Sequence, residues 1–578
     1  MAPCVTRFAF RRFMCLVAPL IVLSCASAPF PEPPPSPGVW TGSPFVATHF
    51  GMVQGLEDAD RTWVWKAIPF ARPPTGPLRW RAPQDPIPWA GVRRETSFNA
   101  GCTRFSSVLP GQIEGSEDCL SLNVWRPRDE ETGLPVYVWI HGGGNSTGSS
   151  TVIPEYYGNS IAARSRVVFV SVNYRLGPFG WFTLPALREG ASAEDASGNY
   201  GTLDIIQSLK WIRQNIEAFG GDANVVTITG ESAGGINVLS LLISPPARGL
   251  FQRAVSESGA ALTRSMEEAD AKAKEVLERL LVNDGRARTR TGAAGIAVGM
   301  SPEDVRSYLR SKSDRQILSL YRVFAMGMIE NPAILRDGAV IPRQGYEVLT
   351  TGEYPNKVPV ILGSNADELK IFLRFGSRIP WQSDLYQAAS RYGSARWKVS
   401  GVDEVARRLV AHPDQPPVYA YQFRWGTLDP EGKSPLPNQW GRELGSFHSL
   451  DIPFFLGHDT VMVIFQAFLF SWQNEPGRKA LSAAMMKYLA RFARTGDPNP
   501  SGGAPGGGLP VWEPWSAAPG GPKCIVFDVR GDAPAIPMSN EELTDQEVMA
   551  AASAELREPL RTRTLQYLQE SPLPSGVR

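Results

Sequence analysis

The sequence VVTITGESAGGINVLSLLI at residues 225–243 decides the fold. Its first residues are a β-branched, apolar run of the kind that forms a buried strand. From Ile236 onward the apolar residues recur at helical spacing instead. The chain must therefore reverse from strand to helix within residues 230–234, which read Gly-Glu-Ser-Ala-Gly.

The Gly-x-Ser-x-Gly pattern is typical of a tight turn that presents a nucleophilic serine. Glycines two residues before and after the serine let neighbouring backbone approach without a Cβ in the way. We therefore expect Ser232 to project above a sheet, beside the free N–H groups that open a helix. A second match surrounds Ser146, but the residues after it have loop composition, so we interpret Ser146 as a loop residue.

A glycine triplet follows another candidate strand. The apolar run at residues 136–140 leads into His141 and then into three glycines at residues 142–144. Successive glycines leave backbone N–H groups unscreened by side chains. This loop therefore suits an oxyanion hole, which the N–H of Ala233 would complete.

A serine nucleophile needs a histidine base and an acid that orients the base. Of the five histidines, His448 and His458 lie downstream of the serine in suitable positions. We favour His448, which is in a polar loop just before an apolar run, and keep His458 as the alternative. The acid should follow a strand, and the run at residues 358–362 precedes Asp367 and Glu368. The residues alone do not choose between these two carboxylates.

Strand-like apolar runs alternate with helical patterns through the middle of the chain. This order predicts an α/β fold whose mostly parallel sheet is covered by helices on both faces, with reactive groups at the carboxyl ends of strands. A net charge of +1 over 578 residues gives no electrostatic case for a nucleic-acid partner. No metal- or nucleotide-binding motif is present, so we expect no metal and no cofactor. The predicted strands are at residues 136–140, 167–172, 225–229, 358–362 and 418–423.

The N-terminus has the features of an export signal. Three arginines precede an apolar run at residues 13–23 that is too short to span a bilayer permanently. The sequence Val-Leu-Ser-Cys ending at Cys25 resembles a bacterial lipobox, which predicts a lipidated Cys25 and a membrane tether. Cleavage after Ala28 is the alternative. We expect export, either as a cell-envelope lipoprotein or in secreted or periplasmic form. The predicted segments are a signal peptide at 1–24, a Pro-rich linker at 25–40 and one large domain at 41–578.

Several longer stretches resemble one known family, the type-B carboxylesterases of the cholinesterase-like branch of the α/β-hydrolases. The resemblance covers most of the chain and implies an α/β-hydrolase fold with cap-forming insertions. It also implies hydrolysis of a small-molecule carboxylic ester through an acyl-enzyme. The stretches that carry it include AIPFA at 67–71, SEDCLSLNV at 116–124, SESG at 256–259 and FHSLDIPF at 447–454.

The resemblance assigns a role to individual residues of this chain. Ser232 would be the nucleophile, His448 the base and Glu368 the acid. It also implies a Cys102–Cys119 disulfide, whereas Cys524 is in an apolar run and is predicted to be a buried free thiol. The expected oxyanion donors are the N–H groups of Gly143, Gly144 and Ala233.

The sequence also departs from the family. Asn145 stands where an aromatic usually follows the glycine triplet, and Leu369 stands where a glycine is common. The loop between the two paired cysteines has no Trp, so no stacking site for a choline cation is expected. The arginine-rich stretch at residues 284–299 is predicted to be a solvated loop. The alternative functions are amide or lactone hydrolysis by the same residues, or a non-catalytic adhesion or binding role.

Overall fold

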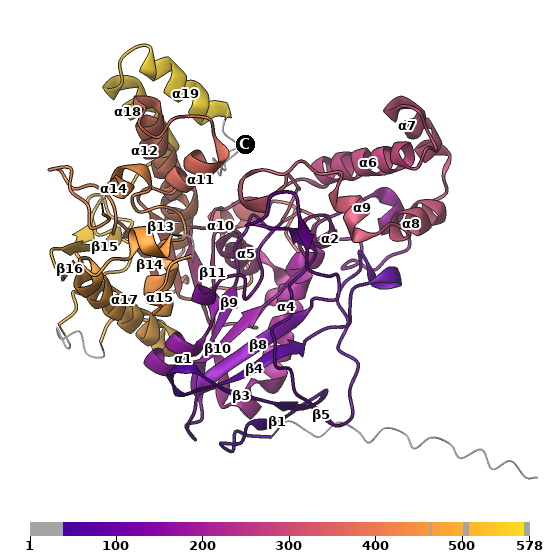
Figure 1. Cartoon of the computed structure of the whole chain (residues 1–578), viewed down its shortest axis with the longest axis horizontal. Helices are drawn as coiled ribbons and strands as arrows, with labels where there is room; N and C mark the ends of the chain where they lie inside the picture. Colours follow the sequence, from indigo (N-terminus) through magenta and orange to yellow (C-terminus); the bar gives the residue numbers. More distant parts are fainter. Residues whose placement is uncertain (1–37, 438, 463–464, 501–507, 571–578) are drawn as a thin grey trace, which may run out of the picture.

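The computed structural model describes residues 38–437, 439–462, 465–500 and 508–570. The predicted signal peptide, Cys25 and nearly all of the Pro-rich linker lie outside these residues. A 12-stranded mixed sheet forms the centre of the molecule (Figure 1). Its order is β16 (Ala533–Ala535), β15 (Cys524–Arg530), β14 (Val418–Phe423), β13 (Val360–Asn365), β12 (Arg253–Glu257), β11 (Gly221–Glu231), β9 (Leu134–Ile140), β10 (Val168–Val172), β8 (Ser121–Pro127), β4 (Thr62–Pro69) and β3 (Leu56–Asp58), with β17 (Met538–Ser539) paired to β15.

The middle of this sheet is parallel, from β10 through β9 to β15, and both edges are antiparallel. The predicted α/β fold and all five predicted strands are therefore confirmed. Four of the five strands have different bounds from those predicted, by one or two residues in β9 and β10 and by more in β11 and β13. β11 starts early because Gly221 pairs with Leu134 across a register shift, and β13 runs on to Asn365 beside β14.

Helices cover both faces of the sheet because the side chains of its central strands alternate between two cores. Along β9, Val136, Val138 and Ile140 belong to one core, whereas Tyr137 and Trp139 belong to the other. The first core is closed by α4 (Tyr200–Asn215), α5 (Ala233–Ile243) and α13 (Glu404–Val410), and the second by α1 (Asn159–Ser165), α15 (Ile452–Leu456) and α17 (Glu475–Thr495).

Two further groups of helices extend beyond these layers (Figure 1). At the upper right of the view, α6 (Met266–Asn283), α7 (Arg290–Gly299), α8 (Pro302–Arg310) and α9 (Asp314–Leu318) form an arm with its own small core. At the upper left, α18 (Asp545–Glu555) and α19 (Leu560–Glu570) pack on α12 (Asp384–Lys398), close to α11 (Leu369–Gly376). The shorter helices are α2 (Gly177–Gly180), α3 (Pro185–Arg188), α10 (Val348–Thr351), α14 (Trp440–Glu443) and α16 (Gln466–Leu469).

The arm corrects one expectation. Residues 290–299, predicted as part of a solvated loop, form the helix α7. Thr289 caps this helix by accepting a hydrogen bond from the N–H of Gly292 at 3.1 Å, and Arg290 pairs with Glu278 of α6 at 3.1 Å. The Gly- and Ala-rich composition hid the helix because its only fully buried residue is Ala293.

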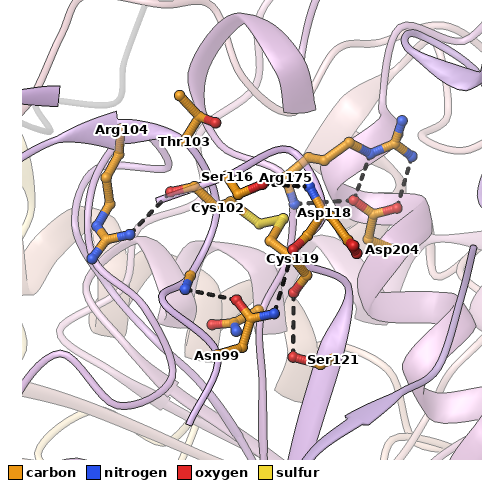
Figure 2. Close-up of a disulfide and its surroundings, with 12 residues drawn as sticks. Asn99, Cys102, Thr103, Arg104, Ser116, Asp118, Cys119, Ser121, Arg175 and Asp204 are labelled. Carbon is orange, nitrogen blue, oxygen red and sulfur yellow. Dashed lines mark hydrogen bonds and ion pairs between the residues drawn. A yellow bond between two sulfur atoms is a disulfide. The ribbon is translucent and has the colours of Figure 1, made fainter. Parts of the chain in front are cut away.

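The predicted disulfide is present. Cys102 and Cys119 are bonded, with their Cα atoms 4.9 Å apart, and Figure 2 shows the bridge close to the buried Arg175–Asp204 ion pair. The bridge closes a loop of 17 residues, which in the chain-entropy model adds about 3 kcal/mol to stability. Cys524 is a buried free thiol, as predicted. Within the described ranges, no helix is both long and apolar enough to cross a membrane.

Candidate active site

Ser232 is at the turn between β11 and α5, as the sequence predicts. Its φ of 59° and ψ of −121° place it in a region that non-glycine residues rarely occupy. Two hydrogen bonds of 2.9 Å hold this turn, from the Ser232 N–H to the carbonyl of Glu257 and from the Ile236 N–H to the carbonyl of Ser232. A Cβ at Gly234 would lie 2.0 Å from the carbonyl oxygen of Ile140, so only glycine lets α5 approach β9 this closely.

The glycine triplet lies against the same turn. A Cβ at Gly142 would be 3.1 Å from the Cβ of Ser232. Gly143 and Gly144 have φ values of 105° and 62°, and neither donates its backbone N–H to another of the described residues. Ala233 is the first residue of α5, so its N–H has no acceptor within the helix. Three free donors therefore belong to the two segments that meet at Ser232.

His448 and Glu368 form a buried pair. His448 Nδ1 lies 2.5 Å from Glu368 Oε2, and the two residues are 4% and 0% exposed. The second oxygen of Glu368 accepts the N–H of Asn365 at 2.7 Å, which fixes the carboxylate at the end of β13. Asp367 instead pairs with Lys370 at 3.0 Å. Of the two candidate carboxylates, Glu368 is therefore the one that contacts His448.

The other ring nitrogen of His448 faces a second carboxylate. Nε2 lies 3.0 Å from Glu231 Oε1, an ion-pair distance without hydrogen-bond alignment, so Nε2 has no hydrogen-bond partner among the described residues. Ser449 Oγ donates to the same Glu231 oxygen at 2.6 Å. No hydrogen bond joins Ser232 to His448 in the described part of the chain. Nε2 is therefore free to accept a proton.

Burial and charge oppose each other at this pair. Burial lowers the pKa of His448, but the negative charges of Glu231 and Glu368 outweigh it and raise the pKa to about 9. Burial raises the pKa of Glu231 to about 7, an effect that the His448 charge partly offsets. The ordinary histidine pKa of about 6.5 therefore does not apply to His448.

The rejected candidates have structural contacts elsewhere. Ser146 is buried, and its Oγ accepts the N–H of Ile329 at 3.2 Å. His458 bonds through Nε2 to the carbonyl of Tyr157 at 2.9 Å. Asn145, which replaces an aromatic of the family, accepts a hydrogen bond from Asn237 Nδ2 of α5 at 2.9 Å. Asn145 therefore ties the glycine loop to the helix behind Ser232.

Sequence reasoning missed three neighbours of His448, which are Glu231, Phe372 and Trp397. Glu231 precedes Ser232 at the end of a buried strand, and this position was a signal that it is buried. Nothing local marks the two aromatics, because only the tertiary fold brings them to His448. No group of three or more His, Cys, Asp or Glu side chains in the described ranges is arranged to hold a metal ion.

All of these site residues lie within the part of the chain that matches a known family. The model of the carboxylesterase family matches residues 42–398 and 382–522. This chain belongs to the carboxylesterase family. The carboxylesterase is 32% identical over 484 residues to the para-nitrobenzyl esterase of Bacillus subtilis, covering 78% of this chain and 90% of the relative. It is 31% identical over 562 residues to liver carboxylesterase 1 of Oryctolagus cuniculus, covering 86% and 91%.

Solved structures of esterases have the same fold as this chain. A Geobacillus stearothermophilus carboxylesterase superposes with a TM-score of 0.66 at 29% identity, covering 88% of this chain and 99% of that one. A para-nitrobenzyl esterase gives 0.65 at 26%, covering 86% and 97%. The predicted type-B family is thus confirmed, and the protein is a carboxylic ester hydrolase with the α/β-hydrolase fold.

Proposed function

We propose that this carboxylesterase cleaves small-molecule esters through Ser232 as nucleophile, His448 as general base and acid, and Glu368 as the group that orients the base. The observation that supports this most is the 2.5 Å contact between His448 Nδ1 and Glu368 Oε2. It fixes the tautomer, so that the free Nε2 is the atom that exchanges the proton.

The reaction then has two halves. In the first, His448 Nε2 takes the Ser232 proton as Oγ attacks the ester carbonyl, and returns it to the departing alcohol. In the second, water attacks the acyl-enzyme by the same route and releases the acid and free Ser232. The N–H groups of Gly143, Gly144 and Ala233 hold the tetrahedral oxyanion, and each donor of this kind is worth about 3 kcal/mol in the transition state.

Ester hydrolysis by matched serine variants tests the proposal. Initial rates on short- and long-chain p-nitrophenyl esters are compared for the parent protein, Ser232→Ala and Ser146→Ala. We expect Ser232→Ala to lose activity by at least about 10³-fold, since the triad acts as a unit. Ser146→Ala removes the serine of the second Gly-x-Ser-x-Gly match and should retain activity. Full activity in Ser232→Ala would refute the assignment.

We infer in addition that the protein is exported and held at a membrane through a lipidated Cys25. This inference is supported by the arginines, the apolar run and the lipobox-like residues 22–25. Radiolabelled palmitate should enter the parent and a Cys4→Ala variant, but not Cys25→Ala, which should leave the membrane fraction. Label in Cys25→Ala would contradict it.

A further inference from the structure

The ring of His448 lies against two aromatic side chains. Its centroid is 4.7 Å from that of Trp397 and 5.0 Å from that of Phe372, with interplanar angles of 47° in both cases. Trp397 and Phe372 are themselves stacked, at 5.7 Å and 14°. The two aromatics come from α12 and α11, so two helices outside the central layers supply one wall of the base.

These two aromatic side chains can restrict the motion of the His448 ring. The hydrogen bond from Nδ1 to Glu368 fixes one atom of the imidazole, but it leaves the ring free to swing about that contact. Within the described part of the chain Nε2 makes no hydrogen bond, and its one charged neighbour, Glu231 at 3.0 Å, is not aligned to fix the plane of the ring. Two aromatic rings packed against the imidazole at a tilt of 47° restrict the plane of the ring without a hydrogen bond to Nε2.

Trp397 is also bonded to the segment that holds the nucleophile. Its indole N–H donates to the carbonyl of Ser258 at 3.0 Å. Ser258 follows Glu257, whose carbonyl accepts the N–H of Ser232 at 2.9 Å, and its own N–H donates to the carbonyl of Gly363 at 2.8 Å. One side chain therefore contacts the base and bonds to the strand end that fixes the serine.

The backbone around Trp397 is anchored as well. It is 5% exposed, and α12 continues past it into a buried π-helical turn, Val399–Asp403. Across that turn Lys398 pairs with Asp403 at 2.7 Å, and Asp403 also accepts the N–H of Leu543 at 3.0 Å. π-helical turns are rare and are often found at functional sites. The C-terminal segment thus helps to hold the indole in place.

We propose that Trp397 is a positioning residue for ester hydrolysis, which sets the His448 ring relative to Ser232 by packing on the imidazole and bonding to the Ser258 carbonyl. This inference rests on the proposed triad. It predicts that loss of the indole affects the chemical steps rather than substrate binding.

The test compares Trp397→Leu and Trp397→Phe with Trp211→Leu, a buried tryptophan on α4 that packs against Phe219. Because a misplacement near 1 Å can cost about 10²-fold, we expect Trp397→Leu to lower kcat by roughly 10- to 100-fold with KM changed less than about threefold. Trp397→Phe keeps a ring but loses the N–H, so its kcat should fall between those of Trp397→Leu and the parent. Trp211→Leu should keep the kcat of the parent.

Two readouts separate positioning from a general loss of structure. The proton in the short bond from His448 to Glu368 should give a far-downfield proton NMR signal. In Trp397→Leu this signal should move or broaden, while in Trp211→Leu it should stay. The rate at which an organophosphonate labels Ser232 should fall in parallel with kcat, because labelling needs the same base.

The proposal is overturned if Trp397→Leu keeps kcat within about threefold of Trp211→Leu, or if KM rises while kcat and the NMR signal are unchanged. If Trp397→Leu fails to fold, Trp397→Phe and Phe372→Leu carry the same readouts, and parent-like values in both overturn it. Activity that survives in Ser232→Ala refutes the triad itself, which is a separate result.

Discussion

Replacing Glu231 by glutamine should move the acidic limb of the pH–rate profile to lower pH. The carboxylate of Glu231 lies 3.0 Å from His448 Nε2 and favours the protonated, inactive imidazole. In the parent, kcat/KM should therefore fall as pH drops below about 9, the raised pKa of His448. Glutamine keeps the shape of the side chain and removes the charge, so the base should stay deprotonated to lower pH.

The size of the shift follows from the same geometry. The rise in the His448 pKa from 6.5 to about 9 corresponds to roughly 3 kcal/mol at 1.36 kcal/mol per unit. Of the two carboxylates, Glu231 makes the larger charge–charge contribution to the raised pKa of His448. An opposite charge at this range moves a pKa by about 1–3 units. The midpoint of the acidic limb should therefore move from about pH 9 to roughly pH 6–8 in Glu231→Gln.

The assay measures kcat/KM for a short p-nitrophenyl ester between pH 5 and 10. Release of p-nitrophenol is followed at the wavelength where its neutral and ionised forms absorb equally. Glu217→Gln removes an exposed charge far from the base and serves as the control. A limb in Glu231→Gln that coincides with that of Glu217→Gln would show that Glu231 does not set the pKa of the base, and the electrostatic reasoning would be wrong.

Three further outcomes are expected. Gly234→Ala should prevent folding or lower the thermal midpoint sharply, because the new Cβ would be 2.0 Å from a backbone carbonyl of β9. Gly295→Ala is the control and should keep the midpoint of the parent, because there is open space around its Cβ. Equal midpoints in the two variants would contradict the close approach of α5 to β9. Cys102→Ser should lower the free energy of unfolding by about 3 kcal/mol in denaturant titrations, and reductant should then have no further effect, unlike in the parent with its Cys102–Cys119 bond. Glu368→Gln should lower kcat by up to about 10⁴-fold through the wrong histidine tautomer, and a loss under tenfold would exclude it as the orienting acid.

Local sequence was enough for the parts of the fold in which one segment dictates its own shape. The strand, turn and helix around Ser232 were predictable because strand period, helix period and two glycines all agree within 19 residues. Helix α7 was not, since its glycines and alanines carry no amphipathic pattern. Its position depends on a cap at Thr289 and an ion pair to α6.

The sequence was enough to name candidate residues for the site, but it did not predict how they are arranged. The residues narrowed the acid to Asp367 or Glu368, and the direction of each side chain depends on what lies opposite, His448 for one and Lys370 for the other. The pKa of His448 was also beyond reach, because it is set by a carboxylate 217 positions away. Contacts between distant segments decide such properties, and no local pattern records them.

The order of strands in the sheet has a consequence for how the enzyme folds while it is being synthesised. During synthesis the serine turn leaves the ribosome long before His448, and β15, the partner of β14, comes later still. The parallel pairs between successive strands from β11 through β15 join segments that are far apart along the chain. Such pairing makes folding slow and leaves strand edges exposed until the C-terminal strands are made. A nascent chain would therefore carry a complete nucleophile turn without hydrolytic activity. We therefore expect ester cleavage to start only once the whole polypeptide has been made and folded.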